Sequence, residues 1–123
     1  MNCDASIRDN LGGYGAIGHN MADHVVFALA GALEDSNIVR VELRAIMSGL
    51  KMASALHISQ VQVQSDSLMA VQMVLGRVQT SWYVANLVED IRALRNGFRV
   101  AFSCFTSEIN FADFLAASYT LEI

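Results

Sequence analysis

Hydrophobic and polar residues alternate along several short segments of the chain, and the clearest of these ends at an acid. In the run that leads to Asp66, Val61 and Val63 share one side while Gln62 and Gln64 share the other. A strand with one buried face needs this period of two. Similar patterns predict strands near residues 1–7, 12–18, 25–31 and 98–104. Short reversals separate the first three strands, which indicates an antiparallel meander.

Between the later strands the hydrophobic period lengthens to that of a helix. Ser36 or Asn37 can cap a helix that runs to about Leu56 and buries one apolar stripe. A second helix is expected from Leu68 to a stop at Gly76. Two more are predicted, from Trp82 to Asn96 and from Ser107 to about Tyr119. The order is three strands, a helix, a strand, one or two helices, a strand and a helix, in one domain over residues 1–123.

A cluster of glycines in the second predicted strand, Gly12–Gly18, invites comparison with a phosphate-binding loop. No Lys-Ser or Lys-Thr pair closes the cluster, and no helical pattern follows it. Glycines that let a hairpin strand approach its neighbours closely explain the segment better.

The composition predicts a domain with a large core and few surface charges. Hydrophobic residues make up 54% of the chain and charged residues 16%, against a usual charged fraction of about 25%. Such a surface favours self-association, so we expect a homodimer formed through exposed apolar surface. The longest stretch without a charged residue, Met52–Ser65, contains Gln, Ser and His, so no membrane span is expected.

The two cysteines, Cys3 and Cys104, lie far apart and in no metal-binding spacing. They are expected to be buried thiols in a reducing compartment. No signal peptide is visible, so the protein is predicted to be intracellular, in the nucleus or cytoplasm, and not secreted. The first strand has almost no lead-in before Asp4, which suggests a fragment of a longer protein or a domain that begins late.

The net charge of −4 argues against a nucleic-acid-binding protein. Two divalent cations held by a cluster of acids would offset it, because bound ions are often the largest local charges in a site.

Four acids occupy comparable places in the predicted elements. Asp4 lies in the first strand, Glu42 near the start of the first helix, Asp66 at the end of the fourth strand and Asp113 in the last helix. Each has an ordinary alternative. Asp66 can be a helix cap, Glu42 can be an acid of the first helical turn stabilised by the helix dipole, and Asp113 can face solvent.

Taken together and in this order, the four acids resemble the four-carboxylate site of ribonuclease H. The sequence is similar to the reverse-transcriptase-like ribonuclease H domains of plants, a branch that lacks the basic protrusion of some relatives. The segments that carry the resemblance are Asn2–Ser6, Val41–Leu50, Val61–Ser67, Asn86–Ile91 and Glu108–Asp113.

The resemblance implies an α/β fold with a five-stranded mixed sheet. Its first three strands would be antiparallel and its last two parallel, with helices on both faces. It also implies a metal-dependent endonuclease that hydrolyses the RNA strand of RNA/DNA hybrids. Two Mg²⁺ ions, which Mn²⁺ can replace, would be held by the catalytic acids Asp4, Glu42, Asp66 and Asp113. Ser6 and Ser67 are candidates for contacts to 2′-hydroxyl groups, and Arg8, Arg40 and Arg44 for contacts to phosphates.

Two departures from the family pattern predict low activity. Family members often carry a histidine where Cys104 stands, and the last motif, which ends at Asp113, is one residue shorter than usual. One residue corresponds to a rotation of about 100° in a helix. The alternative function is therefore a catalytically weakened domain that acts as a nucleic-acid-binding or protein-interaction module.

Overall fold

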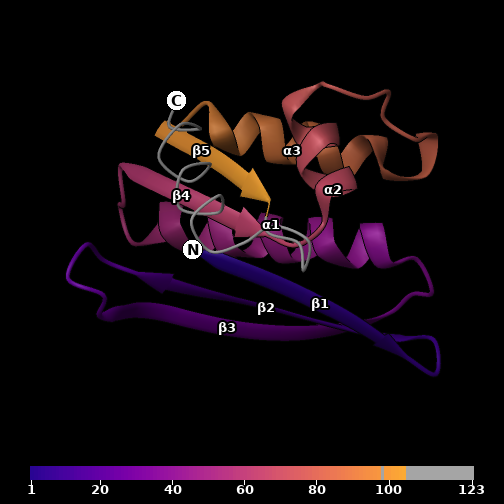
Figure 1. The fold of residues 1–123 in the computed structure, drawn as a ribbon, viewed down its shortest axis with the longest axis horizontal. Helices are drawn as coiled ribbons and strands as arrows, with labels where there is room; N and C mark the ends of the chain where they lie inside the picture. Colours follow the sequence, from indigo (N-terminus) through magenta and orange to yellow (C-terminus); the bar gives the residue numbers. More distant parts are fainter. Residues whose placement is uncertain (98, 105–123) are drawn as a thin grey trace.

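The computed structural model describes residues 1–97 and 99–104, which are coloured along the chain in Figure 1. Two expectations fall outside these residues: the last helix and the position of Asp113.

Five strands form one mixed sheet in the order β3-β2-β1-β4-β5 (Figure 1). The neighbours of β2 are antiparallel to it, whereas β4 runs parallel to both β1 and β5. This confirms the predicted arrangement of three antiparallel strands followed by two parallel ones. The strands are β1 (Asn2–Arg8), β2 (Leu11–His19), β3 (Val25–Glu34), β4 (Gln60–Ser65) and β5 (Arg99–Cys104).

Three α-helices follow the predicted positions closely: α1 (Ile38–Ala55), α2 (Leu68–Leu75) and α3 (Ala85–Arg95). A short 3₁₀ helix, η1 (Trp82–Val84), leads into α3. Of the two candidate caps for α1, Asn37 is the one used, because its side chain accepts a hydrogen bond from the Arg40 N–H. None of the described helices is long and apolar enough to cross a membrane.

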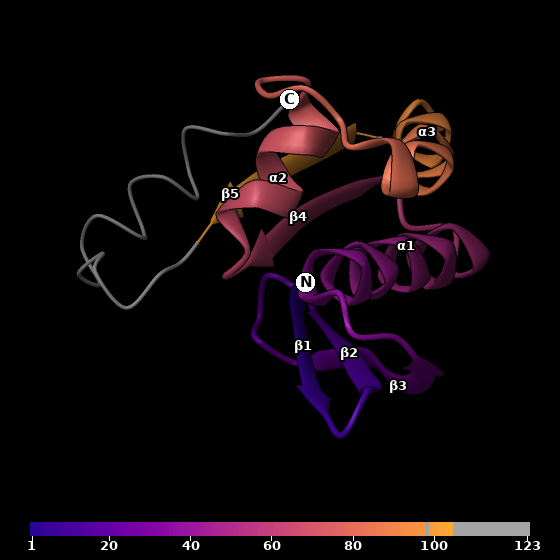
Figure 2. The same ribbon diagram turned by 90° about the vertical axis from the view of Figure 1, so that its right-hand side faces the viewer.

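The core lies between the sheet and the helices. Helix α1 lies between the antiparallel strands and α3, as Figures 1 and 2 both show. Its buried stripe, which includes Leu43, Ile46 and Leu50, joins Val61 and Val63 of β4 in one hydrophobic cluster. The alternation seen in the sequence of β4 thus corresponds to a face packed in the core.

The glycines of β2 allow close packing, as predicted. A Cβ atom built on Gly12 would lie 2.7 Å from Cγ2 of Val41, a core residue of α1. A larger residue at position 12 would therefore push α1 away from the sheet, and with it the residue that follows Val41, the acid Glu42.

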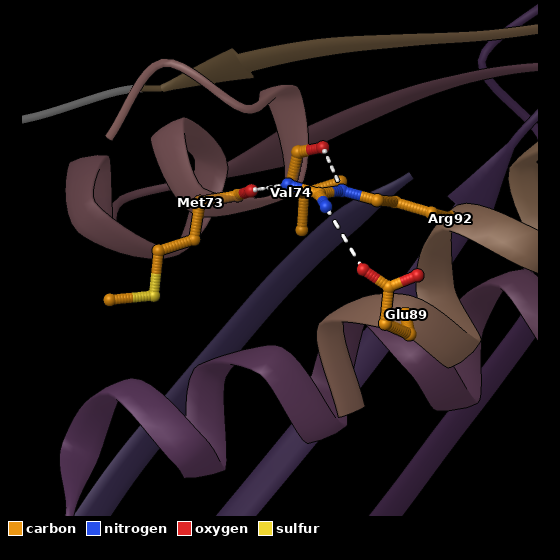
Figure 3. A network of polar contacts seen from close by, with 4 residues as sticks. All are labelled: Met73, Val74, Glu89 and Arg92. Carbon is orange, nitrogen blue, oxygen red and sulfur yellow. Dashed lines mark hydrogen bonds and ion pairs between the residues drawn. The ribbon is translucent and has the colours of Figure 1, made fainter. Parts of the chain in front are cut away.

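Arg92 of α3 holds the end of α2. Its guanidinium donates hydrogen bonds to the carbonyl oxygens of Met73 (2.7 Å) and Val74 (3.2 Å), and it forms an ion pair with Glu89 (Figure 3). Helix α2 ends at Gly76, whose φ of 74° is the left-handed conformation that favours glycine. Arg92 therefore gives the Val74 carbonyl a partner at the end of α2, and it is a second donor to the Met73 carbonyl, which also accepts from the Gly76 N–H at 3.2 Å.

Replacing Arg92 with methionine is expected to lower the free energy of unfolding by about 2 kcal/mol, because two hydrogen bonds from a charged donor are lost. Glu89→Gln removes only the exposed ion pair and is expected to cost less than about 1 kcal/mol. Urea denaturation of both variants measures the difference. Equal losses would mean that the carbonyl contacts do not stabilise α2.

Candidate active site

Asp4 and Asp66 come together because of the register between β1 and β4. These parallel strands pair through Asn2–Gln64 and Cys3–Ser65, so the next residue on each is an aspartate. Neighbouring strands are about 4.8 Å apart, which brings the two carboxylates side by side. Both residues are exposed. The Asp4 carboxylate also accepts a hydrogen bond from the Ala5 N–H at 2.9 Å.

Asp66 is not the cap of α2. The N-cap is Ser67, whose hydroxyl accepts a hydrogen bond from the Ala70 N–H. The cap interpretation of Asp66 is therefore wrong, and its carboxylate is not needed to begin the helix.

Glu42 brings a third carboxylate to the same place from α1. It is the fifth residue of the helix, which has no acid in its first turn, so the helix-dipole interpretation is wrong as well. Glu42 is only 4% exposed. Burial, followed by the negative charges of Asp66 and Asp4, raises the pKa of Glu42 to about 8. A buried acid beside two others needs a positive charge to remain ionised.

Ser65 is a site residue that sequence analysis missed. It is 2% exposed, and its hydroxyl donates a hydrogen bond to the Glu42 carboxylate, which lowers the pKa of that group against the larger opposing effects. The same oxygen accepts a hydrogen bond from the Ser67 N–H. The sequence contained a signal for its burial, because Ser65 follows Val61 and Val63 at the same spacing of two residues and so lies on the same buried face of β4.

The three acids form a cluster suited to a hard divalent cation. One carboxylate oxygen from each of Asp4, Glu42 and Asp66 lies within 4.8 Å of the other two. Among the described residues, Glu42 Oε2 is a buried oxygen with no hydrogen-bond partner, and such an atom costs free energy unless a ligand satisfies it. The donor set contains only carboxylate oxygens, which fits Mg²⁺ or Mn²⁺ and disfavours Zn²⁺. The residues present therefore fit the expected metal.

Residues 2–118 match the model of the family described as reverse transcriptase-like. The chain belongs to this family. The match covers the whole described structure except Met1, and it includes Asp113. No curated protein sequence matches the chain.

Solved structures resemble this reverse transcriptase-like domain in fold. The N-terminal ribonuclease H domain of a Mycobacterium tuberculosis protein has a TM-score of 0.80 at 22% identity, over 96% of this chain and 94% of that one. Ribonuclease H1 of Halobacterium salinarum has a TM-score of 0.76 at 16% identity, over 98% and 91%. LC11-RNase H1, an enzyme isolated from compost and crystallised with an RNA/DNA hybrid, has a TM-score of 0.78 at 14% identity, over 98% and 91%. The fold is that of ribonuclease H.

The predicted substrate contacts of this reverse transcriptase-like domain lie in different environments. Ser6 and Arg8 are exposed and alternate with Asp4 on the same face of β1. Ser67 is occupied as the cap of α2. Arg40 forms an ion pair with Asp35 at 2.8 Å and lies over the ring of Tyr83. Arg44, one turn further along α1, is partly buried. Ser6 and Arg8 are thus the exposed candidates on the strand that carries Asp4.

Proposed function

We propose that this chain is a metal-dependent endonuclease that hydrolyses the RNA strand of RNA/DNA hybrids. The observation that carries the proposal is the convergence of Asp4, Glu42 and Asp66, which come from three separate elements, to within 4.8 Å. Folding like-charged groups together costs stability, and a bound cation is the usual compensation. The likeness in fold to LC11-RNase H1, a structure that contains an RNA/DNA hybrid, supports the choice of substrate.

In this proposal Asp4, Glu42 and Asp66 hold Mg²⁺ or Mn²⁺, with Asp113 as a fourth acid. When bound, two such cations stabilise the negative charge that develops on a phosphate and lower the pKa of bound water. The protein contributes the positions of the ligands. The Ala5 N–H orients Asp4, and the Ser65 hydroxyl orients Glu42 and favours its ionised form.

Substrate contacts are proposed along β1. Ser6 and Arg8 follow Asp4 at intervals of two residues, which places them at steps of about 6.6 Å on the same exposed face. A hydroxyl and a guanidinium at this spacing suit a 2′-hydroxyl group and a phosphate of one strand. Arg44 and, if it leaves Asp35, Arg40 would add positive charge on α1, and Ser67 would contribute through its backbone.

The second candidate is a weakened domain that binds nucleic acid or protein without efficient hydrolysis. Cys104, which ends β5 where family members often carry histidine, favours it. Origin from a plant, a location in the nucleus or cytoplasm, and a single domain over residues 1–123 remain predictions from the sequence.

The test is cleavage of a labelled RNA/DNA hybrid by the full chain with Mg²⁺, with Mn²⁺ and with EDTA. We expect cleavage of the RNA strand with either metal and none with EDTA, while RNA/RNA and DNA/DNA duplexes of the same sequence stay intact. Calorimetry with each metal alone provides a second measurement. An intact hybrid together with no metal binding would contradict the proposal and favour the module.

A further inference from the structure

Strand β3 is a long edge of the sheet. It has ten residues and pairs with β2 on one side, and no strand among residues 1–97 and 99–104 pairs with its other side. Figure 1 shows it along the lower border of the molecule, away from β4 and β5. An edge of this kind presents a row of backbone N–H and C=O groups that can pair with another strand.

The edge lacks the features that usually prevent such pairing. From Val25 to Leu33 it contains no charged residue and no proline, and Glu34 is its only charge. Soluble proteins commonly protect their edges with lysines, prolines, bulges or short strands. The register between β2 and β3 shifts only near Gly18 and His19, opposite the beginning of β3. Within the part of the chain that the structure describes, most of the strand is therefore regular and accessible to a partner.

We propose that β3 pairs antiparallel with β3 of a second copy of the chain, so that two sheets join into one across a twofold axis. This inference is independent of the proposed nuclease function. A second copy fits because the strand is complementary to itself. With Ala30 on the axis, Phe27 lies opposite Leu33, Ala28 opposite Ala32 and Val26 opposite Glu34. Apolar pairs fill the centre and no like charges meet, which is the arrangement that favours cross-strand pairing.

Both faces of the joined strands suit this contact. Phe27, Leu29 and Leu33 are partly buried on the side of α1, and Ala28, Ala30 and Ala32 are exposed on the other side. The partner strand would cover the sides of Phe27, Leu29 and Leu33 that face the sheet edge. The small side chains of the three alanines would let the two backbones approach each other. A twofold axis is also the commonest symmetry of homo-oligomers.

The dimer leaves the acid cluster accessible. Strand β2 separates β3 from β1, so each cluster lies two strands away from the junction. Five strand spacings would separate the two copies of β1, a distance of about 24 Å along the sheet. Because antiparallel pairing keeps the same face of both sheets on one side, the two copies of Asp4 would lie on the same side of the dimer.

The test compares Ala30→Lys with Ala93→Lys. Both residues are exposed alanines, but Ala93 lies on α3, away from the sheet edge. We expect the wild-type chain and Ala93→Lys to dimerise in sedimentation velocity experiments. Ala30→Lys should raise the dissociation constant of the dimer by about tenfold or more, because two lysines would face each other at the axis. Circular dichroism checks that both variants are folded.

A cysteine at position 30 tests the same contact without disturbing it. Residues that face each other across an antiparallel pair have Cα atoms about 4.5 to 5.5 Å apart, within the range of a disulfide. Ala30→Cys should give an oxidised dimer, whereas Ala28→Cys, Ala32→Cys and Ala93→Cys should not. A wild-type chain that is monomeric at all concentrations, or dimers that Ala30→Lys leaves unchanged, would overturn the proposal. Assembly into species larger than a dimer would also overturn it, because pairing across a twofold axis uses the β3 edge of both copies.

Discussion

Replacing Asp66 with asparagine is expected to lower the rate of hybrid cleavage by at least about a thousandfold, while the protein stays folded. A divalent cation contributes several kcal/mol to stabilising a charged transition state, and about 4 kcal/mol corresponds to a factor of a thousand. Asp66 is exposed and Ser67 caps α2, so the substitution removes a proposed metal ligand and leaves the cap intact. Asparagine also keeps a side-chain oxygen that can accept the hydrogen bond that Asp66 shares with Glu42. It also removes a negative charge beside Glu42, and the metal-free variant should be at least as stable as the wild type.

Asp90→Asn is the matched control, because Asp90 is an exposed aspartate of α3 outside the acid cluster. Single-turnover cleavage at saturating Mg²⁺ should be unchanged in this variant. Calorimetry should show weaker Mg²⁺ binding by Asp66→Asn only. Wild-type cleavage by Asp66→Asn would mean that Asp66 is not a ligand, whereas unfolding of the variant would point to a structural role.

The second large effect expected is a loss of stability in the metal-free protein as pH rises. The pKa of Glu42 is raised from 4.5 to about 8 in the folded chain. The folded state therefore keeps a proton that the unfolded chain releases above about pH 4.5. The contribution of Glu42 to stability is complete below that pH, falls as pH rises to about 8, and then stays constant. Its full size is on the order of a few kcal/mol.

Glu42→Gln isolates this effect from other groups that titrate in the same range. Glutamine keeps the shape of the side chain without the charge, so the variant should lose much less stability between pH 5 and 8. Urea denaturation in EDTA at several pH values measures the difference. Mg²⁺ should restore the stability of the wild type at pH 8, because a ligand that binds only the folded state stabilises it. If the free energy of unfolding changed with pH in the same way in both proteins, the burial of Glu42 would not destabilise the folded chain at high pH.

The arrangement of elements could be predicted from the sequence because the local signals are strong and agree with one another. Strand β4 alternates, Gly76 ends α2 in a conformation that suits glycine, and Glu42 interrupts the apolar stripe of α1. The resemblance to ribonuclease H then supplied the single mixed sheet with its two parallel strands, which no local pattern determines. Three of the four expected acids are brought together, and Asp113 lies outside the described residues.

The contacts that could not be predicted are those between distant elements. The pattern around Arg92 is that of an exposed helix face, and its role depends on where α2 ends beside α3. Arg40 likewise looks like a free cation in the sequence, but the fold places Asp35 and Tyr83 next to it. One local contact is also not determined by the sequence: either Ser36 or Asn37 can cap α1, because both residue types are good caps.

The short pairing between β1 and β4 means that the acid cluster lies where the two halves of the sheet join. Two residue pairs join these strands in the ladder, and Met1 adds hydrogen bonds to Gln62 and Gln64, so the antiparallel and parallel halves of the sheet meet along a short stretch. Asp4 belongs to one half and Asp66 to the other, and the two lie just beyond the last pair. A cation held between Asp4 and Asp66 would add a link between the two halves of the sheet. Metal binding would then stabilise the pairing of β1 with β4, and separation of these two strands would release the ion.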